Sequence, residues 1–347
     1  MSKIIDGKIG GELWRKEKGL YKTAIVSGVC GQDGSYLVEH LLDLGYDKVI
    51  GLKRRTSTIN TERVDHIYSH PNFEMKYYDL NDAGCVYNLM VQYSPDEVYN
   101  LAAQSHVRVS FDIPYNTVEG ICMGTLHWLE AIKTINPNCK FYQASSSEMF
   151  GDNPDMPKSG FTEESRLMPA SPYACAKVFA HNLVRNYRES YNLHASSGIL
   201  FNHESPRRGE TFVTRKITIA ANKIKAGLQD RLVLGNLSAS RDWGYAGDYV
   251  KAMHLMLQQE KPDDYVIATG KTYTVEDFLK KTFEYLGLGD YKDYVDFDPK
   301  FLRPQEVPCL LGNASKAKKN LGWKSETNLD GLVKMMCDSD MELIKNK

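Results

Sequence analysis

The stretch Thr23-Ala-Ile-Val-Ser27, followed by Gly28-Val-Cys-Gly31-Gln-Asp-Gly34, decides the fold of this chain. The first five residues suit a buried strand, and the apolar residues after the glycines recur at helical spacing. A first glycine permits a tight turn, a second lets the backbone approach a pyrophosphate, and a third allows close helix packing. Any tight strand-to-helix connection can use glycine. At this position, however, the turn predicts a dinucleotide site that includes Gly28, Gly31 and Gly34.

Strand and helix patterns continue to alternate as far as Leu200. Further strands are expected at 48–52, 73–78, 97–100, 140–144 and 194–200, and helices at 83–93, 115–135 and 171–191. Such alternation requires a parallel sheet with helices on both faces. Beyond Asn202 we expect a helix at 213–226, a short strand at 231–235, a helix at 247–259, a strand at 265–269 that rejoins the sheet, and mostly helices from Val275.

These patterns predict the fold class. It is α/β, a Rossmann-type doubly wound parallel sheet with a smaller, mostly helical C-terminal substrate domain. The expected parts are a polar N-terminal extension at 1–21, a dinucleotide-binding domain at 22–202 plus about 243–270, and a substrate domain at about 203–242 plus 271–347. The site is expected in the cleft between these domains, at the carboxyl ends of the strands.

The amino-acid composition limits the kinds of molecule that this chain is expected to bind. Lysine and arginine number 43 and acidic residues 44, for a net charge of -1, so neither nucleic acid nor a membrane surface is the expected partner. The 7 cysteines form no C-x-x-C pair, which favours reduced thiols in the cytoplasm and no metal site. The first twenty residues lack an apolar run of signal-peptide length.

The second expected strand ends in Lys53-Arg54-Arg55-Thr56-Ser57, where an NAD-binding fold usually presents an acidic residue. Cations and hydroxyls suit a 2′-phosphate, and arginine offers a bidentate fork, so NADP is favoured over NAD. The alternative is a solvated basic loop. Asp79 and Leu80, after the third strand, are candidates to flank the adenine, although a plain turn aspartate is an equal alternative.

Two polar groups lie one helical turn apart in Ser171-Pro-Tyr-Ala-Cys-Ala-Lys177. Tyr173 and Lys177 share a helix face, so the ammonium can favour the phenolate and help it take a proton from an alcohol. A Tyr-x-x-x-Lys pair also arises by chance. Downstream of a dinucleotide turn, the pair predicts hydride chemistry on a hydroxyl group.

The fifth expected strand runs into Gln143-Ala-Ser-Ser-Ser-Glu148. A hydroxyl here can hold the substrate oxygen, and Ser146 is our choice among the three serines, although serines after strands often only form turns. Hydride transfer does not need Glu148, but its carboxylate suits proton abstraction from a carbon next to a ketone. The alternative is a structural glutamate that caps the next segment.

Ten motifs in order resemble the GDP-mannose 4,6-dehydratase family of the extended short-chain dehydrogenase/reductase superfamily. They are Val26–Tyr36, Lys53–Ser57, Asn60–Tyr68, Leu101–His106, Tyr142–Glu148, Ser171–Lys177, Asn202–Gly209, Phe212–Ile217, Arg241–Asp248 and Arg303–Glu306. The chain departs from the pattern at Ser146, which is threonine in many relatives, and at Ser27 and Cys30, where threonine is common.

The resemblance implies a redox-neutral hydro-lyase cycle on GDP-D-mannose with NADP. Tyr173, with Lys177 and Ser146, would deprotonate the C4 hydroxyl during oxidation. Glu148 would remove the C5 proton and assist loss of the C6 hydroxyl as water. Hydride return to C6 would give GDP-4-keto-6-deoxy-D-mannose, on the route to GDP-6-deoxyhexoses such as GDP-L-fucose or GDP-D-rhamnose. The motifs leave open whether the same enzyme reduces this ketone further.

The resemblance also implies binding residues and an assembly. The cofactor would contact the glycine turn with Gln32 and Asp33, and also Arg54, Arg55, Thr56, Ser57, Asp79, Leu80, Leu101, Ala102, Ala103, Gln104, Ser105, Lys177, His203 and Arg208. The nucleotide sugar would contact Ser146, Glu148, Tyr173, Asn202, Lys216, Arg241, Arg303 and Glu306. In this family the loop at 55–65 typically reaches a neighbouring subunit, so a homodimer or homotetramer is expected.

Three rival functions remain at this stage. A UDP-sugar 4-epimerase or a dTDP-glucose 4,6-dehydratase would share the fold, the tyrosine and the lysine. Epimerases do not require a base placed like Glu148, and dTDP-glucose dehydratases resemble an Asp-Glu pair where this chain has Ser147-Glu148. A cofactor-sensing binding protein with a decayed site is disfavoured by the intact Ser146, Glu148, Tyr173 and Lys177.

Overall fold

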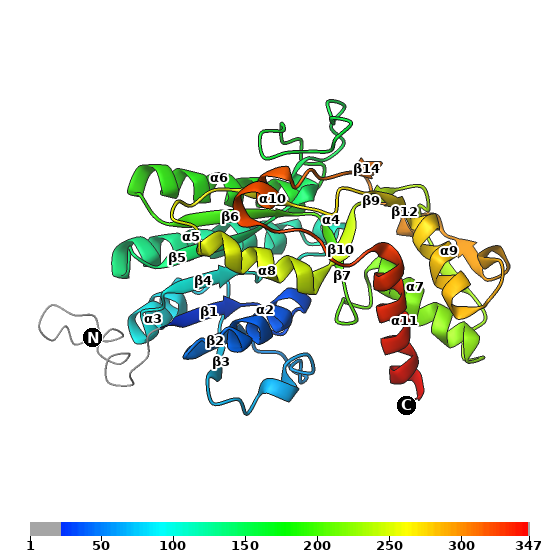
Figure 1. Ribbon diagram of the computed structural model, residues 1–347, viewed down its shortest axis with the longest axis horizontal. Coiled ribbons are helices and arrows are strands. Elements are labelled where there is room, and N and C mark those ends of the chain that lie inside the picture. The colour runs from blue at the N-terminus through cyan, green and yellow to red at the C-terminus, as the bar shows by residue number, and fades with distance from the viewer. Residues whose placement is uncertain (1–21, 346–347) are drawn as a thin grey trace, which may run out of the picture. The chain divides into compact units, whose positions relative to one another are not determined.

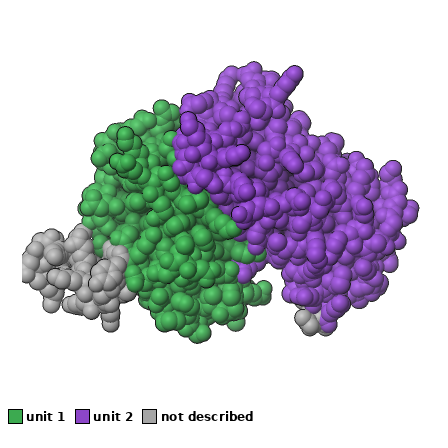
Figure 2. Space-filling view, in the orientation of Figure 1, with its two compact units in different colours: residues 1–146, 171–199, 250–265 green, residues 147–170, 200–249, 266–347 purple. Residues whose placement is uncertain are grey.

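The computed structural model describes residues 22–345, so the expected N-terminal extension at 1–21 lies outside the described residues. The chain divides into two compact units (Figure 2). Unit 1 comprises the described residues up to 146 together with 171–199 and 250–265. Unit 2 comprises 147–170, 200–249 and the described residues from 266 onward.

Unit 1 contains most of a seven-stranded sheet in the order β11-β6-β5-β4-β1-β2-β3 (Figure 1), and only Leu200 of β6 and residues 266–267 of β11 are assigned to unit 2. The strands are β1 Thr23–Ser27, β2 Lys48–Lys53, β3 Phe73–Tyr77, β4 Glu97–Asn100, β5 Lys140–Ser146, β6 Ala195–Leu200 and β11 Tyr265–Ile267. The registers from β5 through β4, β1 and β2 to β3 are parallel. The order reverses at β1, which confirms the predicted doubly wound topology.

Helices cover both faces of this sheet (Figure 1). Their bounds are α2 Gln32–Asp43, α3 Ala83–Tyr93, α4 Val107–Asp112, α5 Pro114–Ile135, α6 Pro172–Tyr191 and α8 Ala246–Leu257, with a short 3-10 turn η1 at Asp65–Ile67. One face buries an apolar core that includes Trp128 of α5, Val184 of α6 and Leu89 of α3. Between residues 22 and 345, no helix combines the length and apolar character that a membrane crossing requires.

The turn between β1 and α2 depends on glycine for two different reasons. Gly28 has φ +73°, a left-handed conformation that side chains rarely adopt, and a Cβ there would lie 3.1 Å from the backbone of Ala102. At Gly34 there is no room for a side chain, because a Cβ would lie 2.3 Å from the Gly28 carbonyl oxygen. The start of α2 therefore packs backbone to backbone against the turn.

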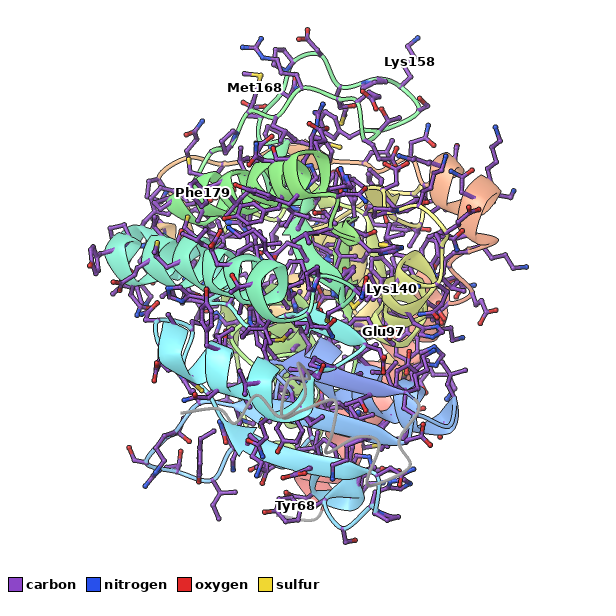
Figure 3. All side chains as sticks on the ribbon, turned by 90° about the vertical axis from the view of Figure 1, so that its left-hand side faces the viewer. Tyr68, Glu97, Lys140, Lys158, Met168 and Phe179 are labelled. Carbon is purple, nitrogen blue, oxygen red and sulfur yellow. The ribbon has the colours of Figure 1, made fainter. Side chains whose placement is uncertain are left out.

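A cluster of buried polar side chains lies at the end of the sheet opposite the glycine turn. Glu97 and Lys140 are register partners at the amino ends of β4 and β5 (Figure 3). The buried Glu97 carboxylate accepts hydrogen bonds from Tyr46 at 2.5 Å and Tyr99 at 2.7 Å. The bond from Tyr46 ties β4 to the segment between α2 and β2, at the end of the sheet away from the glycine turn.

Unit 2 has short strands and several helices around its own core. Its elements are η2 Ser147–Met149, β7 Asn202–Glu204, α7 Val213–Lys225, β8 Leu232–Leu234, β9 Ser240–Arg241, β10 Trp243–Tyr245, β12 Tyr273–Thr274, α9 Val275–Leu286, η3 Tyr291–Asp293, β13 Val295–Phe297, η4 Pro299–Phe301, β14 Cys309–Leu310, α10 Ser315–Leu321 and α11 Leu329–Lys345. The core joins Phe278 of α9, Ile217 of α7 and Met336 of α11.

The observed elements differ from the expected ones in several places, and helix α4 Val107–Asp112 is one that was not expected. Strand β5 runs to Ser146 instead of ending at Ala144, so two of the three serines belong to the strand. The short strands β7, β9, β10, β12, β13 and β14 were missed, because two or three residues are too few to show an alternating pattern. Tyr265–Ile267 forms β11 beside β6, which confirms that this strand rejoins the first sheet.

The close approach at Gly34 yields a stability prediction. Gly34→Ala should destabilise the protein by about 1–3 kcal/mol, because the added methyl group meets rigid backbone. Chemical denaturation followed by circular dichroism measures this loss. Gly331→Ala in α11 is the control, since its nearest obstacle is the Asn328 side chain at 3.3 Å. Equal stability of Gly34→Ala and wild type would contradict the backbone contact.

Candidate active site

Below the glycine turn, a buried hydroxyl joins the carboxyl ends of β1 and β4. Ser27 Oγ accepts hydrogen bonds from the Leu101 amide at 3.0 Å and the Ala102 amide at 3.1 Å, and donates to Asn100 Oδ1 at 3.0 Å. Ser27 is fully buried. The hydroxyl thus holds the predicted cofactor segment 101–105 against the turn, and serine supplies this oxygen as threonine would.

The turn and the start of α2 fit a dinucleotide. No side chain caps α2 at Gly31 among the described residues, and the glycines themselves add no side chain to the turn. Amides at an uncapped helix start suit a pyrophosphate. Sequence reasoning assigned no role to Arg63, whose Nη1 donates to the Cys30 carbonyl at 3.1 Å. The sequence feature that could have identified Arg63 is its place as a cation within the motif Asn60–Tyr68.

The predicted adenosine-binding residues follow β2 and β3. Arg54 and Arg55 are exposed beyond the end of β2, where a ligand can reach both guanidinium groups. Asp79 accepts a hydrogen bond from the Asn81 amide at 3.0 Å, as expected for a turn aspartate. Leu80 packs closely on α5, because a Cβ at Gly124 would lie 2.9 Å from its Cδ2. A turn role and a binding role for Asp79 are compatible.

The segment after β4 reaches the neighbourhood of Tyr173. Gln104 is held by hydrogen bonds from its Nε2 to the His106 carbonyl and the Thr117 hydroxyl, both 3.1 Å. Ala103 packs against the buried cluster that contains Tyr173, Cys122 and Val107. Unit 1 therefore brings Ala103, a predicted cofactor residue, close to the predicted catalytic tyrosine.

Tyr173 and Lys177 are positioned by the start of α6. Ser171 caps the helix by accepting from the Ala174 amide at 3.1 Å, and Pro172 occupies the first turn. Lys177 donates to the Ala144 carbonyl at 2.7 Å, and its Nζ lies 5.7 Å from the Tyr173 ring centroid. Burial lowers the pKa of Lys177 to about 8, and the Asp33 carboxylate opposes that shift. A desolvated ammonium near a phenol favours the phenolate.

Ser145 and Ser146, the two serines of the cluster that lie in unit 1, have different surroundings. Ser146 is a buried residue at the end of β5. Ser145 Oγ lies 3.1 Å from His181 Nδ1, and Arg188 forms a bidentate pair with Asp264 at 2.9 and 2.7 Å. His181 follows Lys177 by one helical turn, a spacing that could have singled it out. The first contact fixes α6 against β5, and the second joins α6 to the residue before β11, so both hold the helix that carries Tyr173.

Unit 2 gathers three predicted residues, Arg303, Glu306 and Arg241, around the buried Glu148. Arg303 Nη1 lies 3.2 Å from Glu148 Oε1, and the Arg303 amide donates to Glu306 at 2.9 Å. Arg241 is buried, and its Nη1 donates to the Val307 carbonyl at 2.8 Å. Burial lowers the pKa of Arg241, while the charge of Glu148 opposes this shift. The cluster can bind an anion with two arginines.

The remaining predicted residues of unit 2 have other surroundings. Lys216 donates to the Val233 carbonyl at 2.7 Å, lies 3.8 Å from the Phe301 ring centroid, and has a pKa lowered by burial and by Lys300. His203 stacks on Tyr249 with ring centroids 4.7 Å apart. The last two are Asn202, which pairs with Trp243 between β7 and β10, and Arg208, which forms an ion pair with Glu204 at 3.0 Å.

No metal centre emerges from the described chain. Within residues 22–345, no group of three or more histidine, cysteine, aspartate or glutamate side chains could hold a metal ion. The polar groups described above include hydroxyls, carboxylates, histidine rings and cations. This set suits proton transfer and the binding of anions.

A family model described as GDP-mannose 4,6 dehydratase matches residues 25–336. The chain belongs to this family. GDP-mannose 4,6 dehydratase 1 of Arabidopsis thaliana is 54% identical over 336 residues, which cover 94% of this chain and 91% of the relative. GDP-mannose 4,6 dehydratase of Homo sapiens is 45% identical, with 93% of this chain and 92% of the relative covered.

Solved structures share the fold of this GDP-mannose 4,6-dehydratase family member at lower identity. UDP-glucose 4-epimerase from Thermotoga maritima has a TM-score of 0.81 at 23% identity, covering 94% of this chain and 100% of the other. RMD from Pseudomonas aeruginosa, complexed with NADPH, has a TM-score of 0.77 at 21% identity, covering 93% and 100%. At these identities the likeness shows the fold alone.

Because Lys177 is buried, we expect it to lower the stability of the folded protein although activity requires it. Its folded pKa of about 8 lies below the ordinary value of 10.5, so the protonated side chain costs stability below about pH 8, and this cost fades as pH rises toward 10.5. Lys177→Met should therefore raise the unfolding free energy at pH 7 by about 1–3 kcal/mol while activity is lost. Losing the bond to Ala144 offsets part of the gain.

Thermal unfolding at pH 7 and pH 9.5 measures this effect for Lys177→Met. The gain in stability should be smaller at pH 9.5. The control is Lys318→Met, which removes an exposed lysine and should change stability little at either pH. A Lys177→Met protein that is less stable than wild type at pH 7 would contradict the cost of burying the ammonium.

Proposed function

We propose that this protein converts GDP-D-mannose to GDP-4-keto-6-deoxy-D-mannose and water. The observation that carries this proposal is family membership together with an intact set of Ser146, Glu148, Tyr173 and Lys177. A relative at 54% identity over most of both chains bears the name GDP-mannose 4,6 dehydratase. The product would enter routes to GDP-6-deoxyhexoses such as GDP-L-fucose or GDP-D-rhamnose.

The proposed cofactor is NADP. When bound, its nicotinamide would accept the hydride of C4 and supply one to C6. The glycine turn and the start of α2 would hold the pyrophosphate, because amides there face an anion without side-chain obstruction. Arg54 and Arg55, exposed at the end of β2, would bind the 2′-phosphate, with Thr56 and Ser57 beside them.

The side chains of unit 1 would carry the first proton transfer. Tyr173 would take the proton of the C4 hydroxyl while Ser146 holds the oxygen. Lys177 would favour the phenolate through its charge, since its ammonium is buried near the ring. The resulting C4 ketone makes the neighbouring C5 hydrogen acidic.

Glu148 would perform the elimination. Its carboxylate would take the C5 proton and deliver a proton to the C6 hydroxyl, which leaves as water. The 4-keto-5,6-ene formed in this way would then accept hydride at C6 and a proton from Tyr173 at C5. Arg241 and Arg303 would bind the GDP diphosphate, and Lys216, Asn202 and Glu306 would contact the rest of the nucleotide sugar.

We also propose that the protein acts in the cytoplasm as a homodimer or homotetramer. The support is the family resemblance of the loop at 55–65. Ile59 in this loop is 83% exposed. Tyr68, which follows the loop and is labelled in Figure 3, is 61% exposed. Large apolar side chains at such exposure suit contact with a second copy of the chain. Size-exclusion chromatography with light scattering measures the oligomeric state.

Incubation with GDP-mannose and catalytic NADP⁺, followed by mass spectrometry, tests the reaction. The expected product is lighter than the substrate by one water. Deuterium placed at C4 should appear at C6, since the hydride removed from C4 is the one returned. An unchanged mass with altered stereochemistry would instead indicate an epimerase. Deuterium that never reaches C6 would exclude the proposed cycle.

The role of Glu148 is separable from the oxidation step. Glu148→Gln should still remove hydride from C4 but lower dehydration by about 10²–10⁴-fold, because the amide cannot accept the C5 proton. Single-turnover absorbance of the reduced cofactor and the mass of the product report the two steps. Glu342→Gln, which alters an exposed glutamate of α11, is the control. Dehydration by Glu148→Gln at the wild-type rate would remove Glu148 from this role.

The choice of NADP over NAD depends on Arg54 in this proposal. Arg54→Ala should weaken NADP binding by about 10-fold or more, the loss expected for one charge-assisted contact, and change NAD binding little. Fluorescence titration with each cofactor measures both affinities. Arg185→Ala, on the exposed face of α6, is the control. An equal loss for both cofactors would show that Arg54 does not read the 2′-phosphate.

A further inference from the structure

Three polar side chains recur at helical spacing along one face of α6. Tyr173, Lys177 and His181 lie four residues apart, so they follow one another along the same side of the helix. All three are buried, and His181 is 8% exposed. The proposed mechanism uses Tyr173 and Lys177 but gives His181 no role.

The imidazole of His181 contacts the residue next to the one that holds Lys177. Lys177 Nζ donates to the Ala144 carbonyl at 2.7 Å, and His181 Nδ1 lies 3.1 Å from Ser145 Oγ. Ala144 and Ser145 are consecutive in β5, and the two α6 residues are one helical turn apart. Helix and strand are therefore joined at two successive points, and two points resist a rotation that a single contact would allow.

The second ring nitrogen of His181 indicates which tautomer is present. Nε2 lies 3.9 Å from Asp264 Oδ2. Burial lowers the pKa of His181, Asp264 opposes this shift, and Arg188 and Arg185 reinforce it, so the ring is neutral at pH 7. The nearby carboxylate favours the proton on Nε2. Nδ1 is then an acceptor, to which the Ser145 hydroxyl donates.

The Asp264 carboxylate that faces His181 is itself held in place. Arg188 donates to its two oxygens at 2.9 and 2.7 Å, and the Ser197 amide donates to Oδ1 at 3.1 Å. Asp264 is also buried. Its oxygens therefore keep a constant direction, and the imidazole lies between this fixed carboxylate and the end of β5.

We propose that His181 is a positioning residue, which holds Ser145 at the end of β5 and so keeps Lys177 where its charge favours the Tyr173 phenolate. This inference rests on the proposed function, in which Tyr173 takes the proton of the C4 hydroxyl. His181 touches neither substrate nor cofactor in this proposal. It acts through the strand that anchors Lys177.

A single peptide unit carries the effect from His181 to Lys177. The Ala144 carbonyl and the Ser145 amide belong to one planar group, so a displacement of Ser145 turns the carbonyl that Lys177 binds. Lys177 Nζ lies 5.7 Å from the Tyr173 ring centroid, and its attraction for a phenolate weakens with distance. Loss of the His181 contact should therefore leave less phenolate at a given pH.

Two substitutions of His181 that differ in one acceptor atom test the proposal. His181→Asn keeps an oxygen near the position of Nδ1, whereas His181→Leu removes the acceptor. Single-turnover reduction of the cofactor with GDP-mannose, measured over a range of pH, reports the first proton transfer. In His181→Leu this rate should fall about tenfold at pH 7, and its acidic limb should move to higher pH by about one unit. His181→Asn should stay within about threefold of wild type, and KM for GDP-mannose should change little in both.

Ser145→Ala removes the same contact from the strand side and should reproduce His181→Leu. Because the two substitutions delete one interaction, the double variant should be no slower than either single variant. Additive losses would overturn the proposal. So would a His181→Leu protein that unfolds at lower temperature but keeps the acidic limb of wild type, since a purely structural role predicts that result. Should His181→Leu not fold, Ser145→Ala and Ser145→Thr form the equivalent pair.

The control is His194→Leu, which removes another partly buried histidine of unit 1, whose Nε2 lies 2.9 Å from the Gln259 carbonyl. This variant should keep the acidic limb of wild type, and an equal shift in it would reject a specific role of His181.

Hydrogen exchange at the end of β5 tests the contact without turnover. The peptide that spans 144–146 should exchange faster in His181→Leu than in His181→Asn, and equal exchange in the two would overturn the proposal. Failure of the proposed function has a different signature, because wild-type protein would then reduce no cofactor with GDP-mannose while the difference in exchange persists.

Discussion

The cofactor side of unit 1 depends on one steric constraint, the backbone contact between the turn after β1 and the start of α2. At Gly34 no room exists for a methyl group, and at Gly28 the chain adopts a left-handed conformation against the segment after β4. The buried hydroxyl of Ser27 then fixes the Leu101 and Ala102 amides beneath the turn. The cradle is therefore made of backbone, which suits a ligand that is recognised through its phosphates.

Both units bury charged side chains at the proposed site residues. In unit 1, Lys177 has a pKa lowered to about 8 by burial, and its carbonyl and carboxylate neighbours only partly compensate for the loss of water. In unit 2, Arg241 is buried beside the Arg303–Glu148 pair. Such groups are costly to bury and are retained where chemistry requires them. The chemistry of these buried groups depends on which residues each of them contacts.

Much of the fold was predictable, because long segments carry strong periodic signals. The helices at 83–93 and 171–191 and the strands around the glycine turn lie within one or two residues of expectation. The two-residue strands of unit 2 were not predictable, since pairing between distant segments creates them. Tyr173 and Lys177 were recognisable from their spacing on one helix. Arg63 and His181 were missed, because their partners lie far away in the chain or on another element.

The sequence by itself determined the parallel Rossmann-type sheet, the family, and the residue types at the proposed site, because these depend on local spacing and on motifs that persist in order. Tertiary structure alone decided the partners of those residues. It showed that Ser145 meets His181, that Ser27 holds the segment after β4, and that Glu148 pairs with Arg303. The physical reason is that burial and charge pairing are set by residues distant in sequence, which no local pattern encodes.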